Sequence, residues 1–99
     1  MKTFLAVYTG TTAARERSGW DQMNERERHA RIERGLTAWR EWGEQHKAVI
    51  VENGGPLGKT KRIGPSGVTD ITNNLAGWIV VHAESHEAAA KLFEGHPHF

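Results

Sequence analysis

The stretch Gly77-Trp78-Ile79-Val80-Val81-His82-Ala83 is the strongest strand prediction in the chain. It holds the longest apolar run and follows a Leu-Ala pair after two asparagines. Because side chains alternate along a strand, Trp78, Val80 and His82 share one face, and the opposite face is more uniformly apolar. We therefore expect His82 to face solvent or an interface rather than the helices.

Four other segments outward from this run predict strands. Residues 4–8 (Phe-Leu-Ala-Val-Tyr) form a nearly continuous apolar run, and residues 48–52 (Ala-Val-Ile-Val-Glu) stop at Asn-Gly-Gly-Pro. Residues 59–63 and 68–71 flank Gly-Pro-Ser-Gly, a turn signal that predicts a hairpin. Residues 11–19 are polar and lack periodicity, which predicts a loop.

Helical periodicity occurs in two places. Residues 21–46 predict a long helix that begins at Asp21 or Asn24 as its cap. One apolar stripe runs along it at helical spacing: Ile32, Leu36, Trp39, Trp42 and His46. Glycine costs about 1 kcal/mol relative to alanine inside a helix, so a break into two helices near Gly35 is plausible. A short second helix begins at Ser85 and ends before Gly95.

The predicted order of elements is β-α-β-hairpin-β-α. A strand-helix-strand at each end of an antiparallel sheet is the pattern of the ferredoxin-like α+β fold. That fold places a further strand after its second helix, and the chain reaches only Phe99. We therefore expect a single domain over residues 1–99 without its final strand, because the native chain is longer or because a partner subunit completes that edge.

Composition narrows the class of protein. The chain has 99 residues, of which 37% are hydrophobic and 25% charged, with no cysteine and a formal net charge of +1. These values exclude disulfides and thiolate chemistry, and they predict no nucleic-acid partner. The apolar runs are too short for a membrane span or a signal peptide, which predicts a cytoplasmic protein. A core this small favours association with a second copy.

Two familiar motifs are excluded by their spacing. Residues 54–60 (Gly-Gly-Pro-Leu-Gly-Lys-Thr) have three residues where a phosphate-binding loop has four, and no helix can start at Lys61 to Pro65. Six histidines suggest a metal site, but His82 and His86 are separated by a strand-to-helix boundary. His96 and His98 are expected to be exposed or structurally bonded. We predict no metal and no cofactor.

The aromatic stripe suggests a pocket between helix and sheet. Trp39, Trp42 and His46 would line it from the helix and Trp78 from the sheet, unless these rings simply fill the core. Polar anchors for a ligand are then Tyr8, His46, Asp70 and His82. A histidine within hydrogen-bond reach of Asp70 would allow acid–base catalysis, so the catalytic candidates are His46, His82 and Asp70.

Several short motifs, in order, resemble the YCII-related (DGPF) domain family of the dimeric α/β-barrel superfamily. They are Gly54-Gly55-Pro56-Leu57, Val68-Thr69-Asp70, the strand from Gly77, Ser85-x-Glu87-Ala88-Ala89 and His96-Pro97. The resemblance covers residues 47–98 in register. It implies a ferredoxin-like protomer whose sheet pairs with a second copy, and a pocket between sheet and helices.

The resemblance also bears on activity. Some members are thought to use a histidine on the first helix, and that position falls at Ala38 or Trp39 here. Asp70 matches the aspartate of the family signature, but Ile71-Thr72-Asn73 replaces the Gly-Pro-Phe that follows it. We therefore expect a homodimer that binds a small aromatic or apolar molecule. The alternatives are a non-catalytic dimerisation or interaction module, and a His/Asp acid–base enzyme acting on a small organic substrate.

Overall fold

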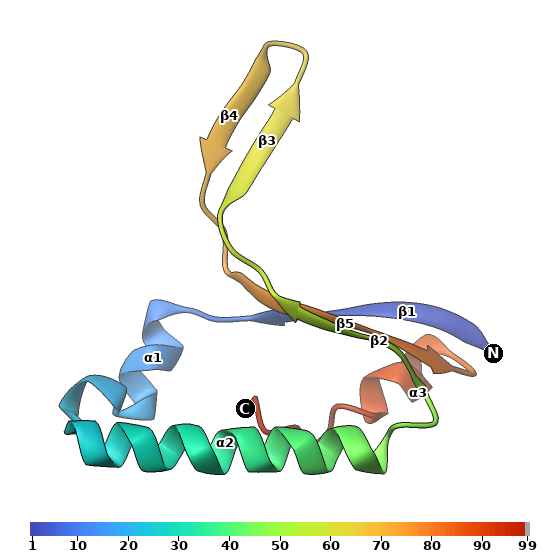
Figure 1. The fold of residues 1–99 in the computed structure, drawn as a ribbon. Coiled ribbons are helices and arrows are strands. Elements are labelled where there is room, and N and C mark those ends of the chain that lie inside the picture. The colour runs from blue at the N-terminus through green and yellow to red at the C-terminus, as the bar shows by residue number, and fades with distance from the viewer. Residues whose placement is uncertain (99) are drawn as a thin grey trace.

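The computed structural model describes residues 1–98 as an α+β protein with two separate antiparallel sheets (Figure 1). The elements in chain order are β1 (Lys2–Thr9), α1 (Thr12–Ser18), the short 3-10 helix η1 (Trp20–Gln22), α2 (Glu25–Gln45), β2 (Ile50–Pro56), β3 (Thr60–Gly64), β4 (Gly67–Ile71), β5 (Leu75–Ala83) and α3 (His86–Lys91). The three α-helices lie on one side of the larger sheet, and the β3–β4 hairpin projects from the other side (Figure 1).

The larger sheet has the strand order β1-β5-β2, and β5 is antiparallel to both neighbours. In its register Phe4 lies opposite Val81 and Ala6 lies opposite Ile79. The predicted alternation of β5 is confirmed, because Ile79, Val81 and Ala83 are buried whereas the residues between them are only half-buried. Its most apolar face therefore packs against the helices.

The core is thin and one-sided. Trp42 from α2 packs on Ile79 and Val81, and six partly buried side chains surround this cluster: Phe4, Ala6, Tyr8, Ile50, Leu92 and Phe93. Within residues 1–98, Ala83 and Ala89 are the only other buried apolar residues. The free energy of hydrophobic burial is roughly proportional to apolar area, so most of it here comes from one short stretch of the sheet.

Helix α2 is continuous, so the expected break near Gly35 is wrong. The cap is Asn24, whose side-chain oxygen accepts from the Glu27 N–H at 2.8 Å while the Glu27 carboxylate accepts from the Asn24 N–H at 3.4 Å. This capping box stabilises the first turn, and the many Arg and Glu residues offset the cost of glycine. Only the C-terminal end of the apolar stripe is covered, because Leu36 is 60% exposed and Trp39 38% exposed, whereas Trp42 is buried.

The loop expected over residues 11–19 is also wrong, because this segment contains α1. The Thr11 hydroxyl accepts from the Ala14 N–H at 3.0 Å, and Gly19 ends the helix in the left-handed region at φ 74°. No residue of α1 is buried, so this helix forms without the apolar periodicity that marks a helix packed on a core. The capping threonine and the glycine were the available signals.

The predicted hairpin is confirmed, with Lys61 opposite Asp70 and Ile63 opposite Val68. Its two strands form a sheet of their own rather than extending the larger one, which corrects the expectation of a single sheet. The chain leaves β2 through an irregular stretch where Gly54 has φ 65°, and a Cβ there would lie 1.8 Å from the carbonyl oxygen of Trp78. Glycine is therefore required at this close approach.

Candidate ligand-binding cleft

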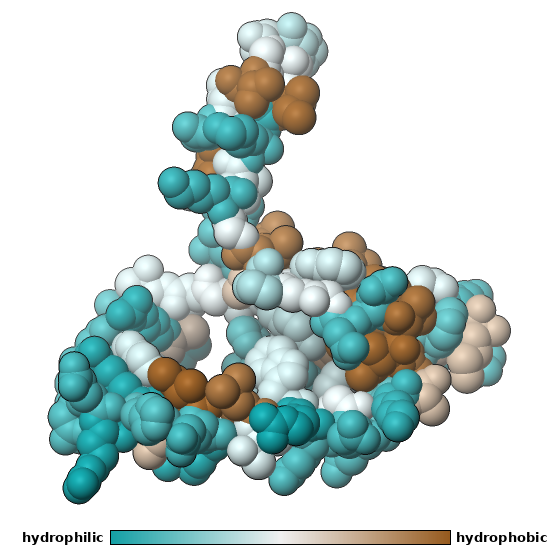
Figure 2. All heavy atoms as spheres, in the orientation of Figure 1, coloured by the Kyte–Doolittle hydropathy of each residue, from teal (hydrophilic) through white to brown (hydrophobic). Residues whose placement is uncertain are grey.

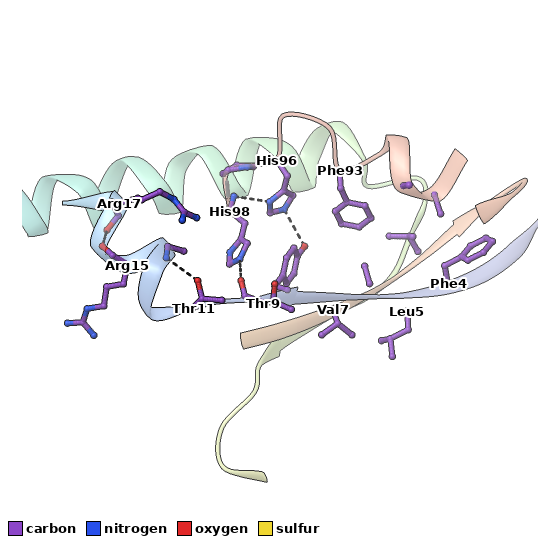
Figure 3. A pocket seen from close by; sticks show the side chains of 18 of the residues that line it. Phe4, Leu5, Val7, Thr9, Thr11, Arg15, Arg17, Phe93, His96 and His98 are labelled. Carbon is purple, nitrogen blue, oxygen red and sulfur yellow. Dashed lines mark hydrogen bonds between the residues drawn. The ribbon is translucent and has the colours of Figure 1, made fainter. Parts of the chain in front are cut away.

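A cleft of about 1330 Å³ opens between β1, α1 and the segment that follows α3. Figure 2 shows it as a hollow between α2 and the sheet, beside α1, and Figure 3 shows the side chains that line it. Phe4 and Phe93 lie at its α3 end, and Thr11 and Arg17 lie at its α1 end. The cleft is therefore apolar at one end and polar at the other, which is a common design of small-molecule sites.

His96 borders this cleft and is the most buried polar residue among those described, with 2% of its surface exposed. Its ring centroid lies 4.5 Å from those of Trp39 and Trp42 and 5.1 Å from that of Tyr8. Trp39 and Trp42 approach it edge-on, and Phe93 lies 5.8 Å away. An imidazole surrounded by four aromatic rings is held in one orientation.

Hydrogen bonds determine the tautomer of His96. The backbone N–H of His98 donates to His96 Nδ1 at 3.0 Å, so that nitrogen carries a lone pair rather than a proton. In the neutral ring the proton is then on Nε2, which donates to the Tyr8 hydroxyl oxygen at 3.2 Å. The Tyr8 hydroxyl hydrogen remains available for another acceptor. His98 Nε2 donates to the Thr9 carbonyl at 2.8 Å, which fastens this segment to β1.

Burial shifts both titrating groups of this pair toward their neutral forms. The pKa of His96 falls to about 4, first because the ring is desolvated and then because His98 and His46 are nearby. Desolvation raises the pKa of the Tyr8 hydroxyl. At neutral pH the pair is therefore uncharged, and it acts as a hydrogen-bond donor rather than as a general base.

Four of the predicted site residues come together around His96. Tyr8 lines the cleft from β1, and Trp39 and Trp42 contact the His96 ring from α2. His46 lies behind Trp42, stacked on it at 4.5 Å, and its Nδ1–H donates to the Trp42 carbonyl at 2.8 Å. Of the predicted ligand-binding residues, only Tyr8 lines the cleft, because Trp39, Trp42 and His46 pack against one another and His96 behind it.

The other predicted site residues are placed elsewhere. Trp78 and His82 point to the face of the sheet away from the helices, where His82 Nδ1 lies 3.4 Å from the Thr3 hydroxyl. Asp70 lies on the projecting hairpin, where its side chain is 84% exposed and pairs with Lys61 at 2.5 Å. Within residues 1–98, neither candidate histidine is bonded to Asp70. The separate hairpin and the alternation of β5 explain why this expected cluster does not assemble.

His96 was expected to be exposed or structurally bonded, and the structure shows it bonded to Tyr8 and to the His98 N–H. Its burial beside a cleft was not expected, and it was not among the predicted site residues. Gly95, with φ 71°, ends the last helical turns and directs the chain back toward β1. A histidine between that glycine and Pro97 was the available signal, because this pattern predicts a sharp, defined turn rather than a continuing helix. Only the return of the chain shows that the ring meets Tyr8.

Residues 1–98 contain no grouping of three or more His, Cys, Asp or Glu side chains suited to holding a metal ion. None of the helices in the same range has the length and apolar character needed to cross a membrane. Comparison of the chain with protein-family models, with curated proteins and with solved structures finds no match.

Proposed function

We propose that the chain is a homodimeric YCII-like domain that binds a small aromatic or apolar molecule in the cleft beside Tyr8 and His96. The observation that carries this proposal is the buried, neutral His96–Tyr8 pair, which borders an open cleft instead of being sealed in the core. A side-chain pair that leaves one hydroxyl hydrogen facing a partly apolar cleft is suited to orienting a ligand.

The topology supports a ferredoxin-like protomer. Strands β1 and β2 flank β5 and are both antiparallel to it, and α2 connects them. This is the split strand-helix-strand unit of that fold, and α3 follows β5 as its second helix would. In the same scheme the hairpin corresponds to an extension between β2 and β5.

Binding is tested with 2-naphthamide, a neutral bicyclic ligand whose carbonyl can accept from Tyr8. We expect two-dimensional NMR titration to shift the signals of Tyr8, Phe93 and His98. Tyr8→Phe should weaken binding by about three- to tenfold, because it removes one neutral hydrogen bond and keeps the ring. His82→Gln, on the opposite face of the sheet, is the control and should leave the affinity unchanged. Absence of shifts around the cleft at millimolar ligand would contradict the proposal.

The face of the sheet opposite the helices supports the dimer. It is largely apolar, with Leu5 64% exposed and Val7 41% exposed beside half-buried Trp78 and Val80. The chain exposes 7894 Å², whereas a monomeric protein of 11.1 kDa exposes about 5,700 Å². Its Cα radius of gyration is 16.2 Å, against about 13 Å for a compact domain of this length. A second copy on this face, beside the projecting hairpin, would cover the surplus surface (Figure 1).

The same observation favours the second candidate function, a dimerisation or interaction module without a ligand. Light scattering coupled to size exclusion at tens of micromolar protein should give twice the mass of one chain. Leu5→Lys should shift the dissociation constant upward at least tenfold, because it places a charge in the centre of the apolar face. Ile63→Lys, at the 81% exposed hairpin position, is the matched control. A wild-type protein that is monomeric would contradict the dimer. If Ile63→Lys gives a monomer and Leu5→Lys does not, the contact between copies lies on the hairpin instead.

A further inference from the structure

The charges around the cleft are of one sign. Its lining includes three arginines and three histidines but no aspartate or glutamate: Arg15, Arg17, Arg31, His86, His96 and His98. The whole chain carries thirteen basic and twelve acidic residues, so this composition is not that of the average surface. Arginine is always charged, and a cleft bordered by three arginines without a carboxylate raises the local concentration of anions.

Two of these arginines lack a carboxylate partner among the described residues. Arg15 is paired with Asp21 at 3.0 Å and points out of the cleft in Figure 3. Arg31 is half-buried, and its guanidinium donates to the Ser18 carbonyl at 2.5 Å, with the Met23 sulfur at 3.9 Å. Neither Arg31 nor Arg17 has an acidic side chain within ion-pair distance in residues 1–98. No carboxylate of the described residues therefore neutralises the charge of Arg17 or Arg31 beside the cleft.

The position of these cations relative to the rest of the cleft indicates what they could bind. Arg17 lies at the α1 end in Figure 3, and Arg31 reaches the same end because it donates to the carbonyl of Ser18, the last residue of α1. Phe4 and Phe93 lie toward α3, with His96 between the two ends. The planar guanidinium presents two parallel donors that match the two oxygens of a carboxylate. The end of the cleft near Phe4 and Phe93 is apolar, so it suits a hydrocarbon ring.

We propose that the ligand of this cleft is an aromatic carboxylic acid, with its carboxylate at Arg17 and Arg31 and its ring extending along β1 toward Phe93. This inference rests on the proposed function, because it specifies the class of molecule that the cleft takes. The neutral Tyr8–His96 pair beside the ring adds no charge that would compete with the arginines for the carboxylate.

The test compares 2-naphthoate with 2-naphthamide, which has the same ring and no charge, by isothermal titration calorimetry. We expect 2-naphthoate to bind about tenfold or more tightly, since hydrogen bonds to charged groups are stronger than neutral ones. The Arg17→Gln, Arg31→Gln double variant should remove this preference, so that the acid binds no more tightly than the amide. The control is Arg40→Gln, which also removes one positive charge. Arg40 is an exposed residue of α2 that lies outside the cleft.

Two further variants separate binding from folding. Arg17 is exposed, so Arg17→Gln alone should fold normally and lose part of the preference for the acid. Arg31→Lys keeps the positive charge and should retain more of the preference than Arg31→Gln. Equal affinities of the wild-type protein for the acid and the amide would overturn the inference and leave the proposed function standing. Failure of both ligands to bind the cleft would overturn both.

Discussion

Replacing Trp42 by alanine is expected to lower the free energy of unfolding by about 3–5 kcal/mol, the usual range for removing a buried tryptophan. Trp42 is 6% exposed and is the only large residue of α2 that is buried. It covers Ile79 and Val81, the centre of the small core, and its Nε1–H donates to the Leu92 carbonyl at 3.2 Å. Because a domain of this size has a stability of only about 5–10 kcal/mol, this variant should lose about half or more of its stability and unfold at a much lower urea concentration.

Urea denaturation followed by circular dichroism measures this effect. Trp42→Phe keeps an aromatic ring against the sheet but loses the bond to the Leu92 carbonyl, so its loss should be smaller than that of Trp42→Ala. Ile63→Ala, on the exposed hairpin, is the control and should change the stability by less than about 0.5 kcal/mol. A Trp42→Ala protein within 1 kcal/mol of the wild type would show that α2 does not seal the core against the sheet.

Acidification from pH 7 to pH 4 is expected to destabilise the protein through His96. The pKa of the unfolded histidine is near 6.5 and that of the buried ring is about 4, so between these values the unfolded state binds a proton that the folded state does not. Stability is therefore full above pH 6.5, falls as the pH is lowered through this window, and levels off below pH 4. The shift corresponds to at most about 3 kcal/mol.

The measurement is the urea midpoint and slope at pH 7, 6, 5 and 4. His96→Gln removes the titrating ring, so its stability should be lower at pH 7 but less dependent on pH between 7 and 4. His29→Gln is the control, because His29 is an exposed histidine of α2 paired with Glu33 at 3.1 Å. If His96→Gln and the wild-type protein lost the same stability over this range, His96 would not be the group responsible.

The sequence predicted the elements whose signals are local. Alternation in β5, the Gly-Pro-Ser-Gly turn of the hairpin and the long apolar stripe of α2 were all recognised. Two expectations about helices were wrong, the loop over residues 11–19 and the break in α2 near Gly35, and each has its own cause. Helix α1 buries nothing, so it shows no apolar periodicity, and α2 survives Gly35 because capping and its other residues offset the cost of one glycine.

The candidate site was predicted only in part, for reasons visible in single residues. Tyr8 and Trp39 were identified because aromatic and polar residues on inward-facing positions suggest a pocket. Asp70 was included because the hairpin was expected to belong to the same sheet, and Trp78 because it lies in the strongest predicted strand. Neither Arg17 nor Arg31 was considered, because Arg17 was expected in a loop and Arg31 on the charged face of a helix, where arginines are usually solvated. Nothing in the local sequence shows that they border a cleft.

By itself, the sequence determined the class of fold and the identity of the core strand, because periodicity, caps and turns act over a few residues. The tertiary structure decided which side chains meet. Tyr8 and His96 are 88 residues apart, and their bond exists only because the chain turns back after α3 and returns to β1. The low pKa of His96 arises in the same way, from burial among rings contributed by β1, α2 and the segment after α3. Desolvation and alignment of this kind depend on packing between distant segments, which no local pattern encodes.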